Sequence, residues 1–168
     1  MNFQKNLLHL MVVGILAILA LGGCGQSWSN KELETEKTAV NLVRETARGG
    51  YQIVTTPELK TWIDQKKPML LIDTMPFEDS YKKQHLPGAQ HYEFPIPEVK
   101  EMDDAAKAKF EKLLGADKDK VLVFYCGFVK CTRSHNGAMW AEKLGYKNVY
   151  RYPGGIKAWT EAGYPVEK

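Results

Sequence analysis

The stretch from Val121 to Trp159, VLVFYCGFVKCTRSHNGAMWAEKLGYKNVYRYPGGIKAW, decides the fold and the chemistry of this chain. It opens with a run of β-branched and aromatic residues, typical of a buried strand, that stops at Cys126. The pair Arg133 and Ser134 then begins a segment of helical composition. Two of the three cysteines in the chain, Cys126 and Cys131, lie in the short segment between. This placement at a strand end indicates a chemical role.

Segments of strand and helix composition alternate on both sides of this loop. The predicted strands are 51–54, 68–73, 90–94, 120–125 and 148–152, and the predicted helices are 56–65, 101–114, 134–144 and 155–163. Continuously apolar strands separated by helices are typical of a parallel sheet that is covered on both faces. We therefore predict the α/β class, with a central, mostly parallel, five-stranded sheet and helices on both faces. Sites in such folds lie at the carboxyl ends of strands, where Cys126 stands.

The N-terminal residues have the layout of an export signal. One lysine precedes an apolar run that is short for a membrane span, and small residues follow up to Cys24. Residues 21–24, LGGC, resemble the lipobox of bacterial lipoproteins, which implies cleavage after residue 23 and a lipid on Cys24. An ordinary secretory signal and an uncleaved anchor helix are the alternatives. Gly25 and Gln26 follow, without Asp, so by resemblance to the sorting pattern we expect a periplasm-facing lipoprotein of the outer membrane in a cell with two membranes.

The chain is thus predicted to have three parts. Residues 1–23 form the signal peptide, residues 24–50 a lipid-anchored tether with an amphipathic helix, and residues 51–168 a single domain. In the tether, Leu33, Val40, Val43 and Ala47 share one face of a helix. A disordered spacer and a dimer contact are the alternatives for this segment.

The net charge argues against one class of partner. Formal net charge is +3, and loss of the single lysine in the signal lowers it to +2. A near-neutral surface of intermixed charges gives no reason to expect nucleic acid as a partner. We expect the membrane, through the lipid, to be a partner, and the sequence leaves a homodimer open.

The order of motifs within residues 51–168 resembles the single-domain rhodaneses, a family of sulfurtransferases. The central motif is a strand that ends at Cys126, a loop, and a helix that begins at Arg133-Ser134. After it come Pro153-Gly154-Gly155-Ile156 and Ala162-Gly163-Tyr164-Pro165. Before it come Leu71-Ile72-Asp73 and His85-Leu86-Pro87-Gly88-Ala89. The resemblance implies the rhodanese fold and a sulfur atom carried on cysteine, without a metal or an organic cofactor.

The loop has the features of an anion site. Backbone N–H groups and the positive end of a following helix favour a thiolate or a persulfide on a strand-end cysteine. Arg133 adds a fixed cation, and Lys130 is a second candidate. We expect Cys126 and Arg133 to be catalytic and Asp73 to support the loop, with direct tuning of Cys126 as the alternative. The remaining loop residues are assigned to substrate binding: Gly127, Phe128, Val129, Lys130, Cys131, Thr132 and Ser134.

The role of Cys131 stays open at this point. A disulfide with Cys126 would close a very small loop, where the entropic gain from cross-linking is least. Cys131 is then a structural residue, a resolving thiol or second sulfur carrier, or a metal ligand together with Cys126 and His135. A fourth ligand for the metal arrangement is not evident, so we expect no metal.

Two departures from the family pattern bear on the donor. From Cys126 to Arg133 the loop counts eight residues instead of the usual six, and Met75 stands where rhodaneses often have Arg. A wide loop in an exported chain is similar to periplasmic polysulfide sulfurtransferases. We expect a small sulfur-containing anion, polysulfide ahead of thiosulfate, as donor, and a thiol, a protein or cyanide as acceptor. The alternatives are a sulfur-carrier module without turnover and a cysteine-dependent phosphatase or arsenate reductase.

Overall fold

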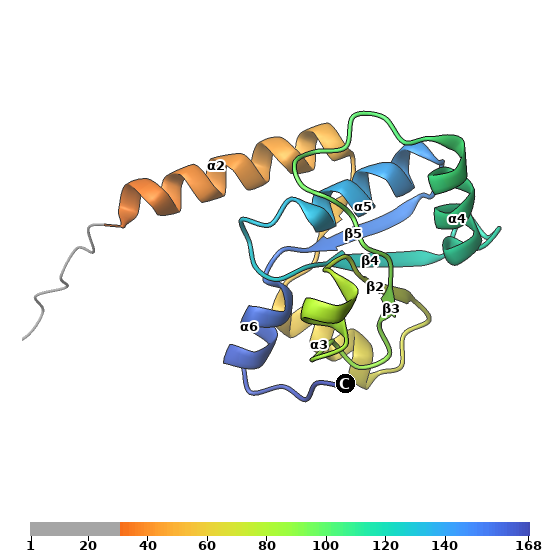
Figure 1. The fold of residues 1–168 in the computed structure, drawn as a ribbon. Coiled ribbons are helices and arrows are strands. Elements are labelled where there is room, and N and C mark those ends of the chain that lie inside the picture. Colours follow the sequence, from red (N-terminus) through yellow and green to blue (C-terminus); the bar gives the residue numbers. More distant parts are fainter. Residues whose placement is uncertain (1–30) are drawn as a thin grey trace, which may run out of the picture. The chain divides into compact units, whose positions relative to one another are not determined.

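The computed structural model describes residues 31–168 (Figure 1). Residues 36–168 form one compact unit, which holds the sheet and the candidate site. The predicted signal peptide and Cys24 lie outside the described residues. Within residues 31–168, no helix combines the length and hydropathy needed to span a membrane.

The elements follow the predicted alternation. In chain order they are α2 (Glu32–Gly49), β1 (Gln52–Ile53), α3 (Thr56–Asp64), β2 (Leu70–Asp73), the π-helix η1 (Phe77–Tyr81), β3 (Gln90–His91), α4 (Asp104–Leu114), β4 (Val121–Tyr125), α5 (Arg133–Lys143), β5 (Asn148–Tyr152) and α6 (Gly155–Glu161). The strands at the sheet edges, β1 and β3, are shorter than the sequence predicts, and η1 was not predicted.

The five strands form one parallel sheet in the order β1-β5-β4-β2-β3. This confirms the predicted α/β class and the five-stranded sheet. Strand β4 lies at its centre, paired with β2 on one side and β5 on the other. Because Tyr125 pairs with Asp73 and with Tyr152, Cys126 leaves the sheet at the carboxyl edge between two neighbouring strand ends.

Helices cover both faces of the sheet, and each face has its own apolar core. One core joins α4 and α5 to the sheet: Ile72, Phe110, Leu114, Leu122, Phe124, Ala138, Met139 and Ala141 are among its buried residues. The other joins α3 and α6 to the opposite face: Leu59, Leu71, Val123, Tyr125, Tyr152, Ile156 and Trp159 are among its buried residues. Figure 1 shows α5 and α6 covering opposite sides of the sheet. Successive strand residues alternate between the two cores, so Cys126 points to the α5 side and Tyr125 to the α6 side.

Helix α2 buries a different face from the one that its pattern indicates. Leu33, Val40 and Val43, which share the predicted apolar face, are 61%, 38% and 68% exposed. Its buried residues are Glu45 and Gly49. A carboxylate is seldom buried without a charged partner, so Glu45 points to a specific contact within the domain.

Candidate active site

The candidate site is the loop that joins β4 to α5. Cys126 follows the last residue of β4 and is 1% exposed. The loop turns back on itself where the Cys131 N–H donates to the Phe128 carbonyl at 3.0 Å, and it ends at Arg133, the first residue of α5. Gly127 is buried, Val129 and Thr132 are half-buried, and Lys130 is exposed. Phe128 faces outward, and 49% of this residue is exposed.

The start of α6 holds the first residues of this loop. The N–H groups of Ile156 and Lys157 donate to the carbonyls of Cys126 and Gly127, both at 3.0 Å. Gly155 has φ +61°, and a Cβ there would lie 2.2 Å from the Cys126 carbonyl oxygen. Only glycine allows both this backbone conformation and this close approach. The Gly-Gly pair of the sequence motif therefore fixes the base of the cysteine loop.

The Cys126 sulfur lies among both donors and acceptors. Ser134 Oγ is 3.1 Å away, and the carbonyl oxygens of Cys131 and Phe128, at 3.3 and 3.9 Å, are alternative acceptors for the single proton of the thiol. Burial raises the pKa of Cys126 well above its ordinary value, and its hydrogen bond to Cys131 acts in the same direction. Cys126 is therefore a protonated thiol in this arrangement.

Cys131 carries the lowered pKa of the pair. The hydrogen bond from Cys126 lowers the pKa of Cys131 to about 6, and bonds from the backbone N–H groups of Arg133 and Gly127 contribute. The sequence predicts a stabilised thiolate on Cys126; in the structure the N–H groups of Arg133 and Gly127 bond the Cys131 sulfur, and the N–H of Ser134 bonds the Cys126 sulfur. Both cysteines are free, and Cys131 is the more exposed one.

Arg133 is oriented differently from expectation. Its Nη1 donates to the carbonyl of Phe94, in the segment after β3, at 3.0 Å. Its backbone N–H bonds the Cys131 sulfur, and its charge lowers the pKa of Cys131. Arg133 thus acts on the site through Cys131 and ties the loop to the chain beyond β3.

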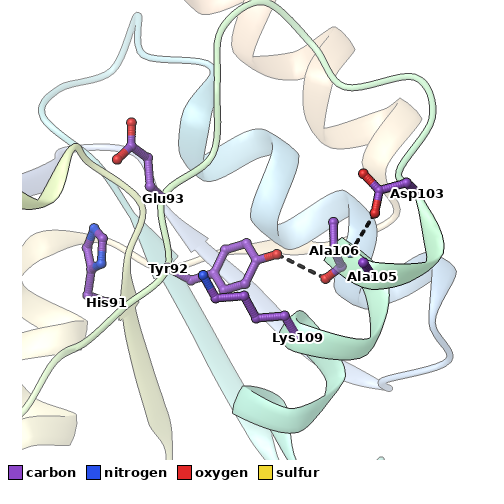
Figure 2. Close-up of a pocket in the computed structure, with 7 residues that line it drawn as sticks. All are labelled: His91, Tyr92, Glu93, Asp103, Ala105, Ala106 and Lys109. Atoms are coloured by element: carbon purple, nitrogen blue, oxygen red, sulfur yellow. Dashed lines mark hydrogen bonds between the residues drawn. The ribbon is translucent and has the colours of Figure 1, made fainter.

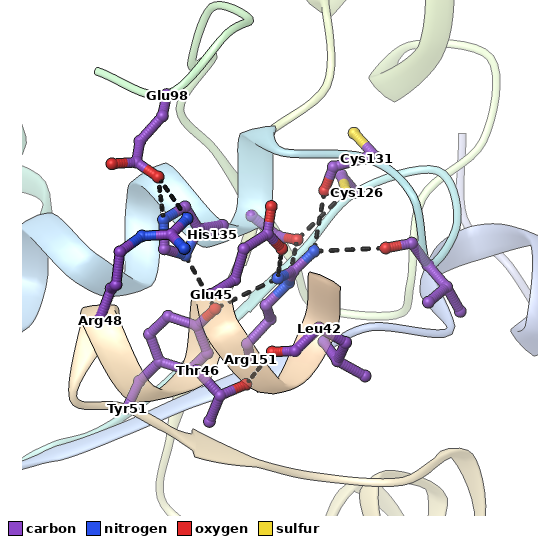
Figure 3. Close-up of polar contacts among 12 residues, drawn as sticks. Leu42, Glu45, Thr46, Arg48, Tyr51, Glu98, Cys126, Cys131, His135 and Arg151 are labelled. Atoms are coloured by element: carbon purple, nitrogen blue, oxygen red, sulfur yellow. Dashed lines mark hydrogen bonds and ion pairs between the residues drawn. The ribbon is translucent and has the colours of Figure 1, made fainter. Parts of the chain in front are cut away.

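A second arginine, Arg151 of β5, lies fully buried behind the loop (Figure 3). Its Nε donates to Ser134 Oγ at 3.0 Å, and its Nη2 donates to the carbonyls of Cys131 and Val129 at 3.0 and 3.4 Å. Ser134 Oγ thus accepts from Arg151, and it can donate its own proton to Cys126 when Cys126 is ionised, which lowers the pKa of Cys126. Sequence reasoning missed Arg151, although a charged residue inside the predicted strand NVYRY was a usable signal.

Asp73 stands at the end of β2, on the face of the sheet opposite to the Cys126 side chain. Its Oδ1 accepts from the Met75 N–H at 2.8 Å, and among the described residues its Oδ2 has no hydrogen-bond partner. Burial raises the pKa of Asp73, although the Met75 N–H and Tyr125 oppose this. The Met75 side chain that Asp73 helps to place lies beside Gly127, with its Cε 3.5 Å from where a Cβ would stand. Asp73 therefore contacts the loop through Met75.

The metal alternative for Cys131 finds no geometric support. His135 is 0% exposed, and its two ring nitrogens face Tyr51 Oη at 2.8 Å and Glu98 Oε2 at 3.1 Å. Among residues 31–168, no group of three His, Cys, Asp or Glu side chains is arranged to hold a metal ion.

A separate pocket opens between the β3 exit and the start of α4 (Figure 2). Its lining residues are His91, Tyr92, Glu93, Asp103, Ala105, Ala106 and Lys109. Lys109 lies over the Tyr92 ring at 5.8 Å from its centroid, and Tyr92 Oη donates to the Ala106 carbonyl. None of the predicted site residues lines this pocket.

Three solved structures illustrate the proteins that share this fold. A thiosulfate sulfurtransferase from Pseudomonas aeruginosa matches with a TM-score of 0.58 at 20% identity, over 77% of this chain and 22% of that chain. The polysulfide-sulfur transferase homodimer of Wolinella succinogenes matches with a TM-score of 0.56 at 15% identity, over 83% and 93%. A protein of unknown function from Rhodopseudomonas palustris CGA009, described as a possible tyrosine phosphatase, matches with a TM-score of 0.55 at 20% identity, over 77% and 93%. At these identities the likeness shows the fold alone.

Sequence comparison identifies the family directly. No curated protein matches the chain. The family model described as the rhodanese-like domain matches residues 55–162. This range includes strands β2 to β5 and the whole cysteine loop. The chain therefore belongs to the rhodanese-like domain family.

Proposed function

We propose that this protein is a sulfurtransferase that carries sulfane sulfur as a persulfide on Cys126. The observation that carries the proposal is the thiol pair itself. Cys126 lies at the end of the central strand, with its sulfur hydrogen-bonded to a second thiol whose pKa is lowered to about 6. A nucleophile beside a group that can take its proton is the arrangement that nucleophilic catalysis requires.

The transfer follows from this arrangement in two steps. The Cys131 thiolate takes the proton of Cys126, and the Cys126 thiolate attacks the outer sulfur of the donor. The sulfur–sulfur bond of the donor breaks, its remainder leaves with the electron pair, and Cys126 holds a terminal sulfur as the persulfide anion. An acceptor thiolate or cyanide then attacks this terminal sulfur, and Cys126 leaves as a thiolate that recovers a proton.

We further propose polysulfide, or a related sulfane-sulfur anion, as the donor. The half-exposed Cys131 and the exposed Phe128 put a polarisable thiol and an aromatic ring on the open side of the loop. Arg133 is turned toward Phe94, so the loop has one side-chain cation fewer for a compact dianion such as thiosulfate. This orientation also disfavours the phosphatase alternative, in which a guanidinium must bind the phosphoryl oxygens.

Mass spectrometry of the intact protein tests the proposal. The protein is treated with polysulfide or thiosulfate, freed of excess donor, and weighed before and after addition of cyanide or a thiol. We expect mass increments of whole sulfur atoms that the acceptor removes. Cys126→Ser abolishes the transferable sulfur, whereas Cys131→Ser retains part of it.

Three other outcomes would point elsewhere. Transferable sulfur that survives in Cys126→Ser and disappears in Cys131→Ser would place the persulfide on Cys131. Loading without repeated turnover would identify a carrier module. Absence of any increment, together with hydrolysis of an aryl phosphate that needs Cys126, would replace the proposal with the phosphatase reading.

A further inference from the structure

Arg151 is anchored from a part of the chain that lies outside the family-matched region. Its Nη1 bonds Glu45 Oε2 on α2 at 2.5 Å and Tyr51 Oη at 3.2 Å. Both partners precede residue 55, where the match to the rhodanese-like domain begins. Figure 3 shows the guanidinium between α2 on one side and the cysteine loop on the other.

The guanidinium uses all its donors in this position. Together with the bonds to Ser134, Cys131 and Val129, it makes five hydrogen bonds to the described residues. Five is the number of N–H donors that a guanidinium has. Glu45 and Arg151 are 5% and 0% exposed, and removing one partner of such a buried pair leaves an uncompensated charge. The orientation of Arg151 is thus fixed from both sides at once.

A chain of polar contacts holds the Tyr51 side of this anchor. Tyr51 Oη meets His135 Nδ1, His135 Nε2 meets Glu98 Oε2, and Arg48 of α2 donates to the same Glu98 oxygen at 2.8 Å. Burial lowers the pKa of His135, so the ring is neutral at pH 7. The tautomer that satisfies both contacts carries its proton on Nε2, donates to Glu98 and accepts from Tyr51. The last turns of α2 are therefore bonded to the domain at Glu45 and at Arg48.

The contacts of Arg151 with the loop have a direct chemical consequence. Arg151 Nε donates to the Ser134 oxygen and so fixes its position 3.1 Å from the Cys126 sulfur, where the Ser134 hydroxyl can donate to Cys126 once Cys126 is ionised. Arg151 Nη2 holds two loop carbonyls, and the Cys131 carbonyl is one of those that face the Cys126 sulfur. The same guanidinium therefore sets both the donor and an acceptor that the Cys126 sulfur meets.

We infer that Arg151, held in place by Glu45 of α2, is a positioning residue for sulfur transfer, and that the end of α2 is part of the active site. The inference rests on the proposed sulfurtransferase function. Arg151 acts by orienting the Ser134 hydroxyl toward the sulfur of Cys126, where negative charge develops when the thiolate or persulfide forms. Glu45 acts through Arg151.

The test uses the full chain with Arg151→Lys, Ser134→Ala and Glu45→Ala, and with Glu36→Ala as a matched control. Glu36 lies on the exposed part of the same helix. Lysine keeps the positive charge but lacks the planar fork of donors. Since a hydrogen bond to a charged group is worth more than a neutral one, we expect about a tenfold or greater loss of sulfur transfer in the first three variants. Glu36→Ala transfers sulfur at the wild-type rate.

A pH profile separates positioning from a purely structural role. The alkylation rate of Cys126 is followed against pH, with Cys126 resolved from the other cysteines by peptide mass. In Arg151→Lys and Ser134→Ala the half-maximal pH rises, because the thiolate loses an oriented donor. Thermal unfolding identifies the variants that remain folded at the assay temperature. An unchanged profile in folded Ser134→Ala and Arg151→Lys would overturn the inference.

A double-mutant cycle tests the route from Glu45 to Cys126. If Glu45 acts through Arg151 and Ser134, the loss in Glu45→Ala/Ser134→Ala is smaller than the product of the two single losses. Losses that simply multiply would show that Glu45 acts independently of Ser134. If the wild-type chain acquires no transferable sulfur, the proposed function fails, whereas the Cys126 alkylation profiles still decide the positioning role.

Discussion

The two loop cysteines differ because their sulfurs meet different backbone groups. Cys126 is buried against the carbonyls of Cys131 and Phe128, which stabilise its proton. Cys131 accepts from the N–H groups of Gly127 and Arg133, which stabilise its negative charge. Residue type alone does not separate them, since burial raises the pKa of Cys126, while the hydrogen bond from Cys126 lowers the pKa of Cys131 and these backbone groups add to the difference.

The first prediction concerns the pH dependence of Cys131. Because the pKa of Cys131 is lowered to about 6, the thiolate forms as pH rises through that value. The alkylation rate of Cys131 should therefore rise between about pH 5 and 7 and then level off. In Cys126→Ala the principal cause of the shift is lost, and the half-maximal pH moves upward. Peptide-resolved alkylation measures both profiles, and identical profiles in the two proteins would contradict the assigned cause.

The second prediction concerns Asp73. Its pKa is raised by burial, so the folded state disfavours its charge and the native protein loses stability as pH rises through that raised pKa. Asp73→Asn keeps an oxygen to accept from the Met75 N–H but carries no charge. It should have a larger free energy of unfolding than wild type at pH 7, and the difference should shrink toward pH 4, where Asp73 protonates.

Urea unfolding at the two pH values measures this difference. Asp79→Asn is the control, because the Asp79 side chain is 88% exposed. A lower stability of Asp73→Asn at pH 7 would show that the carboxylate is favoured by its surroundings, against the assigned shift.

At the level of elements, the site is built from three strand-to-helix connections. The cysteine loop joins β4 to α5, the segment after β2 places Met75 beside Gly127, and the turn after β5 starts α6 under the loop. All three leave the same carboxyl edge of the parallel sheet, where such folds bind their ligands. The alternation of strands and helices thus brings together segments that lie far apart in the sequence.

The third prediction tests the contact between α6 and the cysteine loop. Gly155→Ala forces a side chain into a left-handed conformation, which costs roughly 1–2 kcal/mol, and brings its Cβ against the Cys126 carbonyl. Gly163→Ala is the control, since Gly163 has φ +73° but a Cβ there meets nothing within 4 Å. We expect a larger loss of unfolding free energy, together with loss of sulfur transfer, in Gly155→Ala. If urea unfolding gave the same loss of unfolding free energy in both variants, the close approach of Gly155 to the Cys126 carbonyl would not contribute to stability.

At the level of the whole molecule, α2 connects the domain to the N-terminal segment of the sequence. The C-terminal part of α2 is bonded to the domain through Glu45 and Arg48. In the sequence, Cys24 precedes this helix, and we propose that it is the lipid attachment site of an envelope lipoprotein. The apolar residues Val40 and Val43 remain exposed, so the side of α2 that carries them does not pack against the domain. The polar bonds of Glu45 and Arg48 attach this helix to it.

The fourth prediction concerns the proposed anchor. In cells that process lipoproteins, the full chain should sediment with membranes, because two or three acyl chains hold a protein stably at a bilayer. Cys24→Ser should shift it to the soluble fraction, whereas Cys131→Ser should not. Membrane fractionation followed by mass analysis of the N-terminal peptide measures the effect. Retention of Cys24→Ser in the membrane fraction, with the signal still attached, would favour an uncleaved anchor helix.

The sequence alone determined the class of fold, the central strand and the loop that carries the cysteines. These features are local: an apolar run of strand length, a helix composition or a glycine-rich turn acts over a few neighbouring residues and leaves a pattern in the sequence. The sequence predicts strands β1 and β3 too long, because the extent of a short edge strand depends on pairing with its neighbour rather than on its own composition.

Only the tertiary structure decided which groups surround the two sulfurs. Arg151 and Glu45 are 106 positions apart in the sequence, and no local pattern links them. Their pairing depends on how α2 and β5 pack, and the protonation of Cys126 depends on its burial and on the hydrogen bond to Cys131 that the closed loop allows. The chain alone shows where sulfur chemistry is expected, whereas the folded contacts determine which cysteine carries the proton and which arginine positions the site.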